Sequence, residues 1–223
     1  MGFITINKNQ ELYYGGKQGW WKEDDSIFSE YGCGVISMCN MEILLWNKYV
    51  KTDDTEEIFY DINNIAYDDY RNYVNKRYKD SYFFSRFKFL SKLGLLPWTM
   101  KSGLKTFMRQ LGMKSKIKWA PTIRKNCIMS YIEDMLNKDI PITTSYFVFL
   151  RNRQLDFYTY ENSKLCKSTS CTSHYFNIID VVDIPENDEK YFVVSSWGKK
   201  YYIKVVDWIN KLSFFTNILY CSL

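Results

Sequence analysis

The chain has 223 residues, a mass of 26.8 kDa and a net charge of +5, and 46% of its residues are apolar. This length fits one large domain or two lobes that share a cleft, and the apolar fraction is ample for a core. No apolar run approaches the roughly 20 residues of a membrane-spanning helix, and the N-terminus lacks the apolar segment of a signal peptide. We therefore expect a cytoplasmic protein with no membrane span.

The positive charge is too modest and too scattered to indicate a nucleic-acid-binding surface. Basic residues cluster at 71–79, 114–118 and 124–125, but no DNA- or RNA-recognition motif accompanies them. Solvated helix and loop faces explain these clusters more readily than a nucleic-acid-binding surface does. We predict no nucleic-acid partner.

Cysteine spacing argues against a disulfide framework, because the six cysteines are spread over a long chain. Cys166, Cys171 and His174 form a C-x4-C-x2-H group that would need one more ligand to hold zinc, and Cys33 or Cys221 could supply it. The spacing matches no common zinc module, and His174 is the sole histidine. We predict no metal and no cofactor, and keep a zinc-stabilised structural protein as an alternative.

A mainly apolar run from Val35 to Trp46 predicts a helix inside the fold. Ser37, Asn40 and Glu42 interrupt the run without forming a continuous polar face. At its N-terminus Cys33 lies between two glycines, which allow close approach of backbone or substrate. The free N–H groups of a first turn and the helix dipole favour a thiolate. Cys33 is therefore a candidate nucleophile, and the alternative is a buried structural thiol.

Periodicity predicts the remaining elements of the first part of the chain. Residues 1–14 are predicted to form an extended arm. The glycines of 15–19 followed by two tryptophans predict a loop, which is either a turn held in place by the tryptophans or a bend that presents the Gln18 amide to a cleft. The acidic segment 22–30 leads into the Cys33 helix. Further helices are predicted from a capping box at Asp53 and Glu56, at about 66–77, 83–93, 104–111 with Gly112 as its cap, and 128–136.

The second part of the chain changes to β-branched and aromatic patterns. Strands are predicted at 140–150, 157–160, 174–184, 190–196, 201–205 and 214–221, with a polar loop before residue 174 and a short helix at 207–212. Helices followed by an antiparallel sheet predict an α+β fold. We expect one domain over 1–223, with a helical lobe at about 15–138 and a sheet lobe at about 139–223.

Three motifs in this order carry a resemblance. Gly32-Cys33-Gly34 opens the buried helix, His174 begins a late strand, and Ser195-Ser196-Trp197-Gly198 follows the next strand. This arrangement resembles the papain-like cysteine peptidase superfamily, nearest its bacteriocin-leader-processing (double-glycine) branch and similar bacterial proteins. The stretches 15–21, 132–142 and 197–203 resemble further segments of those relatives. The resemblance implies a papain-like fold, in which a central buried helix of the helical lobe carries the cysteine and faces an antiparallel sheet lobe.

A thiol nucleophile needs a base that takes its proton and later protonates the leaving group. The chain's sole histidine, His174, is the candidate, and we expect it to form an ion pair with Cys33. The alternatives for His174 are an ordinary strand-edge histidine or a zinc ligand. The resemblance also assigns the oxyanion hole to the Cys33 N–H and the Gln18 amide, which requires segment 22–30 to loop out.

Ser195 departs from the family pattern, because the relatives place Asn or Asp there to orient the histidine. A hydroxyl accepts one hydrogen bond from an imidazole but stabilises an imidazolium less than a carboxylate does. Asp180 is a candidate substitute. By the same resemblance, Trp197 would shield the bond to His174 from water, and its alternative is an ordinary core tryptophan.

These observations predict a cysteine peptidase or a related thiol amidohydrolase that acts on a peptide or a small amide. An acyltransferase would use the same residues. The alternatives are a papain-like binding module that has lost activity, for which Ser195 is the best evidence, and the zinc-stabilised structural protein.

Overall fold

A computed structural model of the protein describes residues 2–49, 61–80, 95–114, 116–121, 125–147, 154–184, 189–212 and 216–222. The predicted capping box at Asp53 and Glu56 and the predicted helix 83–93 lie outside these residues. Within the described ranges, no helix combines the length and the apolar character that crossing a membrane requires.

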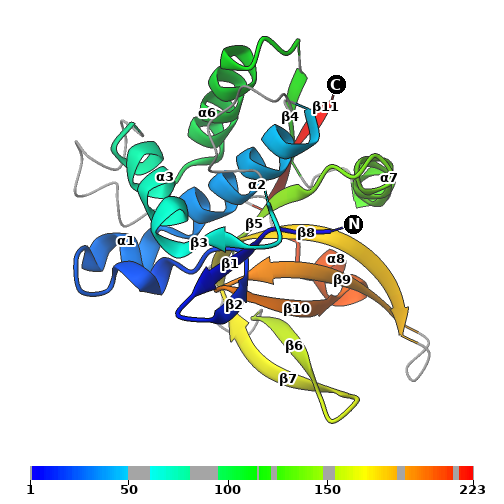
Figure 1. The fold of residues 1–223 in the computed structure, drawn as a ribbon. Coiled ribbons are helices and arrows are strands. Elements are labelled where there is room, and N and C mark those ends of the chain that lie inside the picture. Colours follow the sequence, from blue (N-terminus) through cyan, green and yellow to red (C-terminus); the bar gives the residue numbers. More distant parts are fainter. Residues whose placement is uncertain are drawn as a thin grey trace.

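The fold is α+β and is built on an eight-stranded sheet in which each neighbouring pair is antiparallel (Figure 1). The strand order is β4-β11-β5-β8-β9-β10-β6-β7. The bounds are β4 Lys116–Pro121, β5 Ile142–Phe147, β6 Leu155–Glu161, β7 Lys164–Cys171, β8 Ser173–Ile184, β9 Glu189–Ser196, β10 Lys199–Lys204 and β11 Asn217–Ser222. The predicted strands thus form one continuous sheet.

A second, three-stranded sheet forms at the N-terminus in the order β2-β1-β3. Its strands are β1 Thr5–Lys8, β2 Glu11–Tyr14 and β3 Ile65–Ala66, and β3 pairs parallel to β1. Asn9 and Gln10 have φ values of 54° and 69°, so they form the tight two-residue turn that joins β1 to β2. The predicted extended arm is therefore a hairpin.

The helices are η1 Gln18–Trp21, α1 Ser26–Tyr31, α2 Cys33–Tyr49, α3 Tyr67–Asp80, α6 Pro97–Gln110, α7 Lys125–Leu136 and α8 Val205–Asn210. Five of them occupy predicted helical segments. The short helices η1 and α1 replace a predicted loop and a predicted polar segment, and the Asp25 carboxylate caps α1 by accepting a hydrogen bond of 2.9 Å from the Phe28 N–H. Pro97 is the first residue of α6, a position at which the backbone N–H would have no helical partner, so its absence costs nothing.

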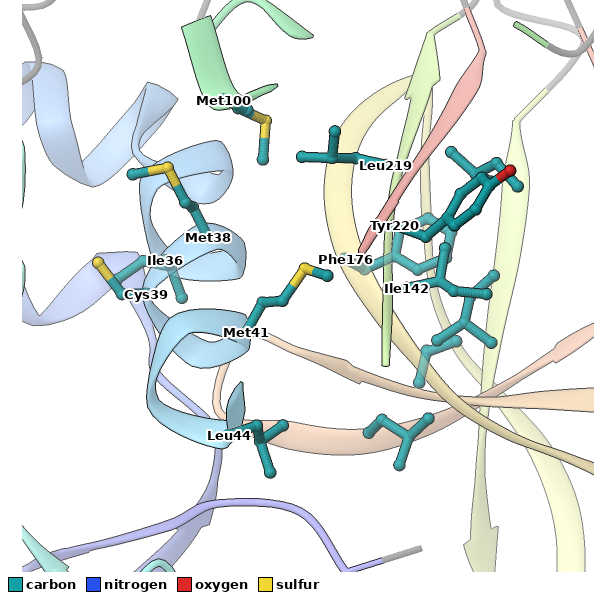
Figure 2. Packing of buried hydrophobic residues seen from close by; sticks show 14 of the residues in the cluster. Ile36, Met38, Cys39, Met41, Leu44, Met100, Ile142, Phe176, Leu219 and Tyr220 are labelled. Atoms are coloured by element: carbon teal, nitrogen blue, oxygen red, sulfur yellow. The ribbon is translucent and has the colours of Figure 1, made fainter. Parts of the chain in front are cut away.

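Helix α2 is buried along almost its whole length, as the sequence predicts. Every residue from 34 to 45 is buried. Figure 2 shows Met41 reaching from α2 towards Ile142 of β5 and Phe176 of β8, while Cys39 points to the other side of the helix. Apolar side chains are thus needed all round α2, because it has protein on every side.

The buried carboxylate of Glu42 ties α2 to α3. Arg77 donates to it from Nε at 2.9 Å and from Nη2 at 2.6 Å, and the Tyr73 hydroxyl donates at 2.8 Å. Burial raises the pKa of Glu42, and the charge and hydrogen bonds of Arg77 act against that rise. A polar residue that interrupts the apolar run is therefore fully partnered.

Two strands of the large sheet lie where the sequence predicted none. β4 was expected to be a solvated basic segment, and β7 a Ser/Thr/Lys-rich loop. They are the two edge strands of the large sheet, where charged and polar side chains are normal because one side faces solvent. In β4, Ile117 is buried between the exposed Lys116 and Lys118, so a period-two pattern is present but short. The segment before residue 139 thus contributes to the sheet.

Candidate active site

Cys33 begins α2, and the glycine that follows it allows the helix to approach β8 closely. A Cβ atom on Gly34 would lie 2.8 Å from the Leu95 Cβ and 3.2 Å from the Tyr175 ring, so a side chain there would displace its neighbours. The backbone N–H of Tyr175 is close enough to the Cys33 thiol to act towards lowering its pKa. The thiol therefore lies against β8, beside the residue that follows His174.

The surroundings of the Cys33 thiol favour its neutral form. Cys33 as a residue keeps some exposure, but burial of the thiol raises its pKa to about 11, although the N–H groups of Tyr175, Gly34 and Cys33 itself act in the opposite direction. The expected thiolate at the helix N-terminus is thus not favoured in the free protein, because loss of solvation outweighs the N–H groups.

His174 is held in a closed, largely aromatic environment on β8. Its imidazole stacks on the Trp197 indole with 4.1 Å between ring centroids and an angle of 15° between the planes, and Phe157 contributes a ring edge. Burial lowers the pKa of His174 to about 3, so the imidazole is neutral at pH 7. Because both groups are neutral, the expected Cys33–His174 ion pair is not the resting state.

The hydrogen-bond partner of His174 is Ser196, the residue after the predicted Ser195. The Ser196 Oγ lies 2.6 Å from His174 Nε2, and Ser196 is buried. Ser195 instead donates from Oγ to the backbone carbonyl of Tyr14 at 2.9 Å. Adjacent residues of a strand point to opposite faces of the sheet, so only one of the two serines can meet the imidazole. Asp180 accepts from the Val181 N–H and lines a different cavity.

Trp197 has a backbone conformation that is rare for a large side chain. Ser196 pairs with Lys199, so Trp197 and Gly198 form a two-residue turn between β9 and β10, with φ values of 48° and 74°. Such turns require positive φ at both central residues, which favours Asn or Gly at the first position. The left-handed conformation of Trp197 coincides with its stacking on His174 and therefore indicates a constraint on this side chain.

Gln18 lies at the start of η1 and faces the segment that leads into α2. Its Nε2 donates hydrogen bonds of 3.1 Å to the carbonyl of Ser29 and of 3.1 Å to the carbonyl of Glu30. A primary amide has two N–H donors, so both are engaged in this structure. Gln18 lies near the start of α2, because the segment between Gln18 and Cys33 loops out. Its amide, however, holds the end of α1, so both of its N–H groups are used and neither is directed at the thiol.

A buried polar network behind the thiol joins α2 to β8 and to the N-terminal loop. Asn40 donates from Nδ2 to Asn177 Oδ1 at 3.3 Å and accepts at Oδ1 from the Tyr70 hydroxyl and the Gly16 N–H. Asn177 in turn donates to the Ser37 carbonyl at 3.0 Å and to Thr143 Oγ1 at 2.9 Å. In the sequence Asn40 was noted only as an interruption of the apolar run, and Asn177 was overlooked. A single amide within the apolar strand 174–184 could have indicated a buried polar contact.

The double glycine ahead of Gln18 fits against this network. A Cβ on Gly15 would lie 2.4 Å from Ser195 Oγ, and one on Gly16 would lie 2.0 Å from the Tyr70 hydroxyl. Gly15 also has a φ of 79°, which side chains rarely adopt. Both positions therefore require glycine for the loop to reach α2 and β9.

These side chains line one small pocket at the N-terminal end of α2. Its lining residues are Gly16, Gln18, Cys33, Ile36, Ser37, Asn40, His174, Tyr175, Ser195, Ser196 and Trp197. The structure thus brings together all four predicted site residues, which come from η1, α2, β8 and β9. The free volume is about 10 Å³, close to the minimum that a water molecule needs. A substrate would therefore reach the sulfur only after the residues that line the pocket move.

The zinc alternative finds no support in the placement of its ligands. Among the residues that the structure describes, which include Cys166, Cys171 and His174, no three His, Cys, Asp or Glu side chains are grouped so that they could hold a metal ion. Cys166 and Cys171 lie on β7, and the Nε2 of His174 is engaged by Ser196.

Comparisons of the chain with models of protein families, with curated proteins and with solved structures give no match.

Proposed function

We propose that this protein is a papain-like thiol hydrolase or acyltransferase that acts on an amide bond, with Cys33 as nucleophile and His174 as base. The observation that carries the proposal is the pocket at the N-terminal end of α2, which the side chains of Cys33 and His174 both line. A cysteine at the start of a buried helix that packs on an antiparallel sheet bearing a histidine is also the arrangement that the sequence resemblance implies.

The chemistry starts from a neutral pair. As the sulfur attacks the carbonyl carbon, the imidazole of His174 takes the thiol proton, and the carbonyl oxygen becomes an oxyanion. The tetrahedral intermediate collapses to a thioester while the imidazolium protonates the departing amine. Water then adds to the thioester carbonyl while His174 takes a proton from the water. The second tetrahedral intermediate releases the carboxylic acid, and His174 gives that proton to the Cys33 sulfur as it leaves. In an acyltransferase an acceptor nucleophile replaces the water. By the resemblance, the Cys33 N–H would be the backbone donor to the oxyanion.

Two residues position the base in this scheme. Ser196 holds Nε2 at 2.6 Å, which leaves Nδ1 as the nitrogen to serve the thiol, and Trp197 fixes the plane of the ring by stacking on it. Gln18 positions the entry to α2 through the carbonyls of Ser29 and Glu30. A peptide is the favoured substrate class by resemblance, and a small amide would use the same residues.

A binding module without activity is the second candidate. The low pKa of His174, the high pKa of Cys33 and the small free volume of the pocket favour it. The two candidates differ in whether Cys33 can be acylated at a rate that depends on His174.

Acylation of the protein by p-nitrophenyl acetate separates the candidates. The hydrolase proposal predicts a burst of nitrophenolate stoichiometric with the protein, an acetyl group on Cys33 by peptide mass spectrometry, and loss of the burst in His174→Gln. Cys127→Ser serves as the control, because Cys127 is an exposed thiol outside the pocket. A Cys33 that stays unmodified, or is acetylated equally fast in His174→Gln, would refute the hydrolase proposal and support the binding module.

A further inference from the structure

A second cavity, of about 270 Å³, lies over β8, β9 and β10 next to the end of β2. Its polar lining consists of Tyr14, Tyr160, Asp180, Asp183, Lys200 and Tyr202, and its floor is aliphatic. Tyr14 connects the two cavities, because its backbone carbonyl accepts the hydrogen bond of Ser195, which lines the active-site pocket. The proposed chemistry uses none of the side chains of this second cavity.

The aromatic walls of the cavity are arranged around a positive charge. The ammonium of Lys200 lies 5.9 Å from the centre of the Tyr14 ring and 5.8 Å from that of Tyr202. The edge of one ring of the Tyr160–Tyr202 pair meets the face of the other, with 5.0 Å between centroids and 88° between planes. Ammonium groups within about 6 Å of such rings are attracted by their negative faces.

The charges of the lining favour a cation over an anion. Asp180 and Asp183 contribute two negative charges and Lys200 one positive charge, and burial raises the pKa of Tyr14 to about 12, so its hydroxyl stays neutral. The Lys200 side chain is exposed, so its ammonium can leave the rings and move into solvent. The volume lies just below the range for whole small-molecule ligands, which suits a single long side chain.

We propose that this cavity binds an alkylammonium group, such as the side chain of a lysine in a peptide, which takes the place of Lys200 over the tyrosine rings. The aliphatic floor would contact the methylene chain, and the carboxylates of Asp180 and Asp183 would attract the ammonium. This site goes beyond the proposed chemistry and does not require it.

Binding is measured by NMR titration of amide resonances with Nα-acetyl-lysine methylamide, and with the norleucine analogue as the uncharged ligand. We expect shifts at Asp180, Val193 and Tyr202, and tighter binding of the lysine derivative. Lys200→Met should tighten lysine binding about threefold, which is the effect of removing one like charge about 6 Å from the bound ammonium in a water-like dielectric. Asp180→Asn should weaken it. Lys199→Met is the matched control, since Lys199 is an exposed lysine of the same strand outside the cavity.

n-Pentylamine carries the same ammonium without the peptide groups and separates the two sources of such a group. Tighter binding of capped lysine assigns the cavity to a peptide lysine, tighter or equal binding of n-pentylamine assigns it to a free amine, and either result supports the proposal. Equal binding of lysine and norleucine derivatives, weaker lysine binding in Lys200→Met, or shifts confined to other surfaces would overturn it.

Discussion

Replacing Arg77 by leucine should test how strongly the buried ion pair fixes helix α2. The side chain of Glu42 is 0% exposed and that of Arg77 is 15% exposed, so solvent screens the pair little. Removing one partner leaves a buried carboxylate with the Tyr73 hydroxyl as its remaining donor among the three contacts described. Breaking a buried pair in this way costs about 3–5 kcal/mol of folding free energy, and we expect a loss in this range at pH 8.

The size of that loss should depend on pH. Without the guanidinium, only the Tyr73 hydroxyl opposes the effect of burial on Glu42, and the pKa of Glu42 in the folded state rises further above its value in the unfolded chain. The folded variant then binds more protons than the unfolded variant between these two pKa values, so its stability increases as pH falls. Each unit of additional pKa shift is equivalent to about 1.4 kcal/mol. The loss caused by Arg77→Leu should therefore be smaller at pH 5 than at pH 8 by more than about 1 kcal/mol.

Urea denaturation at both pH values measures these quantities. Lys138→Met is the control, because Lys138 and Asp134 form an exposed pair one helical turn apart, with side chains 56% and 53% exposed. Such pairs contribute about 0.3–0.5 kcal/mol. A loss for Arg77→Leu as small as that of Lys138→Met, or one that is the same at pH 5 and pH 8, would contradict the reasoning.

Three further outcomes follow from the site. The sole histidine should show no titration between pH 4 and 8 in NMR spectra, because burial lowers the pKa of His174 to about 3. Trp197→Asn opens the imidazole ring to water and should move this pKa towards 6.5. An unchanged pKa in this variant would refute the shielding role of Trp197. The unfolded chain protonates His174 more readily than the folded protein does, so the free energy of unfolding should fall as pH drops from 6.5 towards 3. This fall should be steeper in the wild type than in His174→Gln by up to about 1.4 kcal/mol per pH unit. Equal pH dependence of the two proteins in urea denaturation would be inconsistent with a buried neutral imidazole. Gly34→Ala should cost about 1–3 kcal/mol by overpacking against Leu95 and Tyr175. Gly19→Ala should change thermal stability little, because the atom nearest to its added Cβ would be the flexible Lys17 side chain at 3.5 Å. Similar losses in both variants would refute the packing argument.

The elements with a strong period were predictable from sequence. Helix α2 and strands β8 to β10 have long apolar or alternating patterns. Such a pattern identifies the element whichever partner covers its apolar side. The edge strands β4 and β7 were not predicted, since an edge strand needs few apolar residues and its pairing depends on a partner far along the chain. Helix α1 was also overlooked, because its six residues are too few to show a helical period.

At the site, the residues were easier to predict than their contacts. Cys33, Gln18, His174 and Ser195 line the same pocket, but the choice between Ser195 and Ser196 as partner of His174 depends on which face of β9 each occupies. Sequence alone does not give that register at the end of a strand. The protonation state was also inaccessible, because the helix N-terminus favours a thiolate while burial opposes it, and only the packing decides which effect is larger.

The burial of α2 on all sides has a consequence for biosynthesis. The helix leaves the ribosome well before β8, to which it is joined by the hydrogen bond from Asn177 to Ser37, a contact that spans 140 residues of chain. Contacts of such long range form slowly, because a large loop must close first. A nascent chain therefore displays an apolar segment on all its faces until the sheet is complete, and this interval is when aggregation or chaperone binding is most favourable.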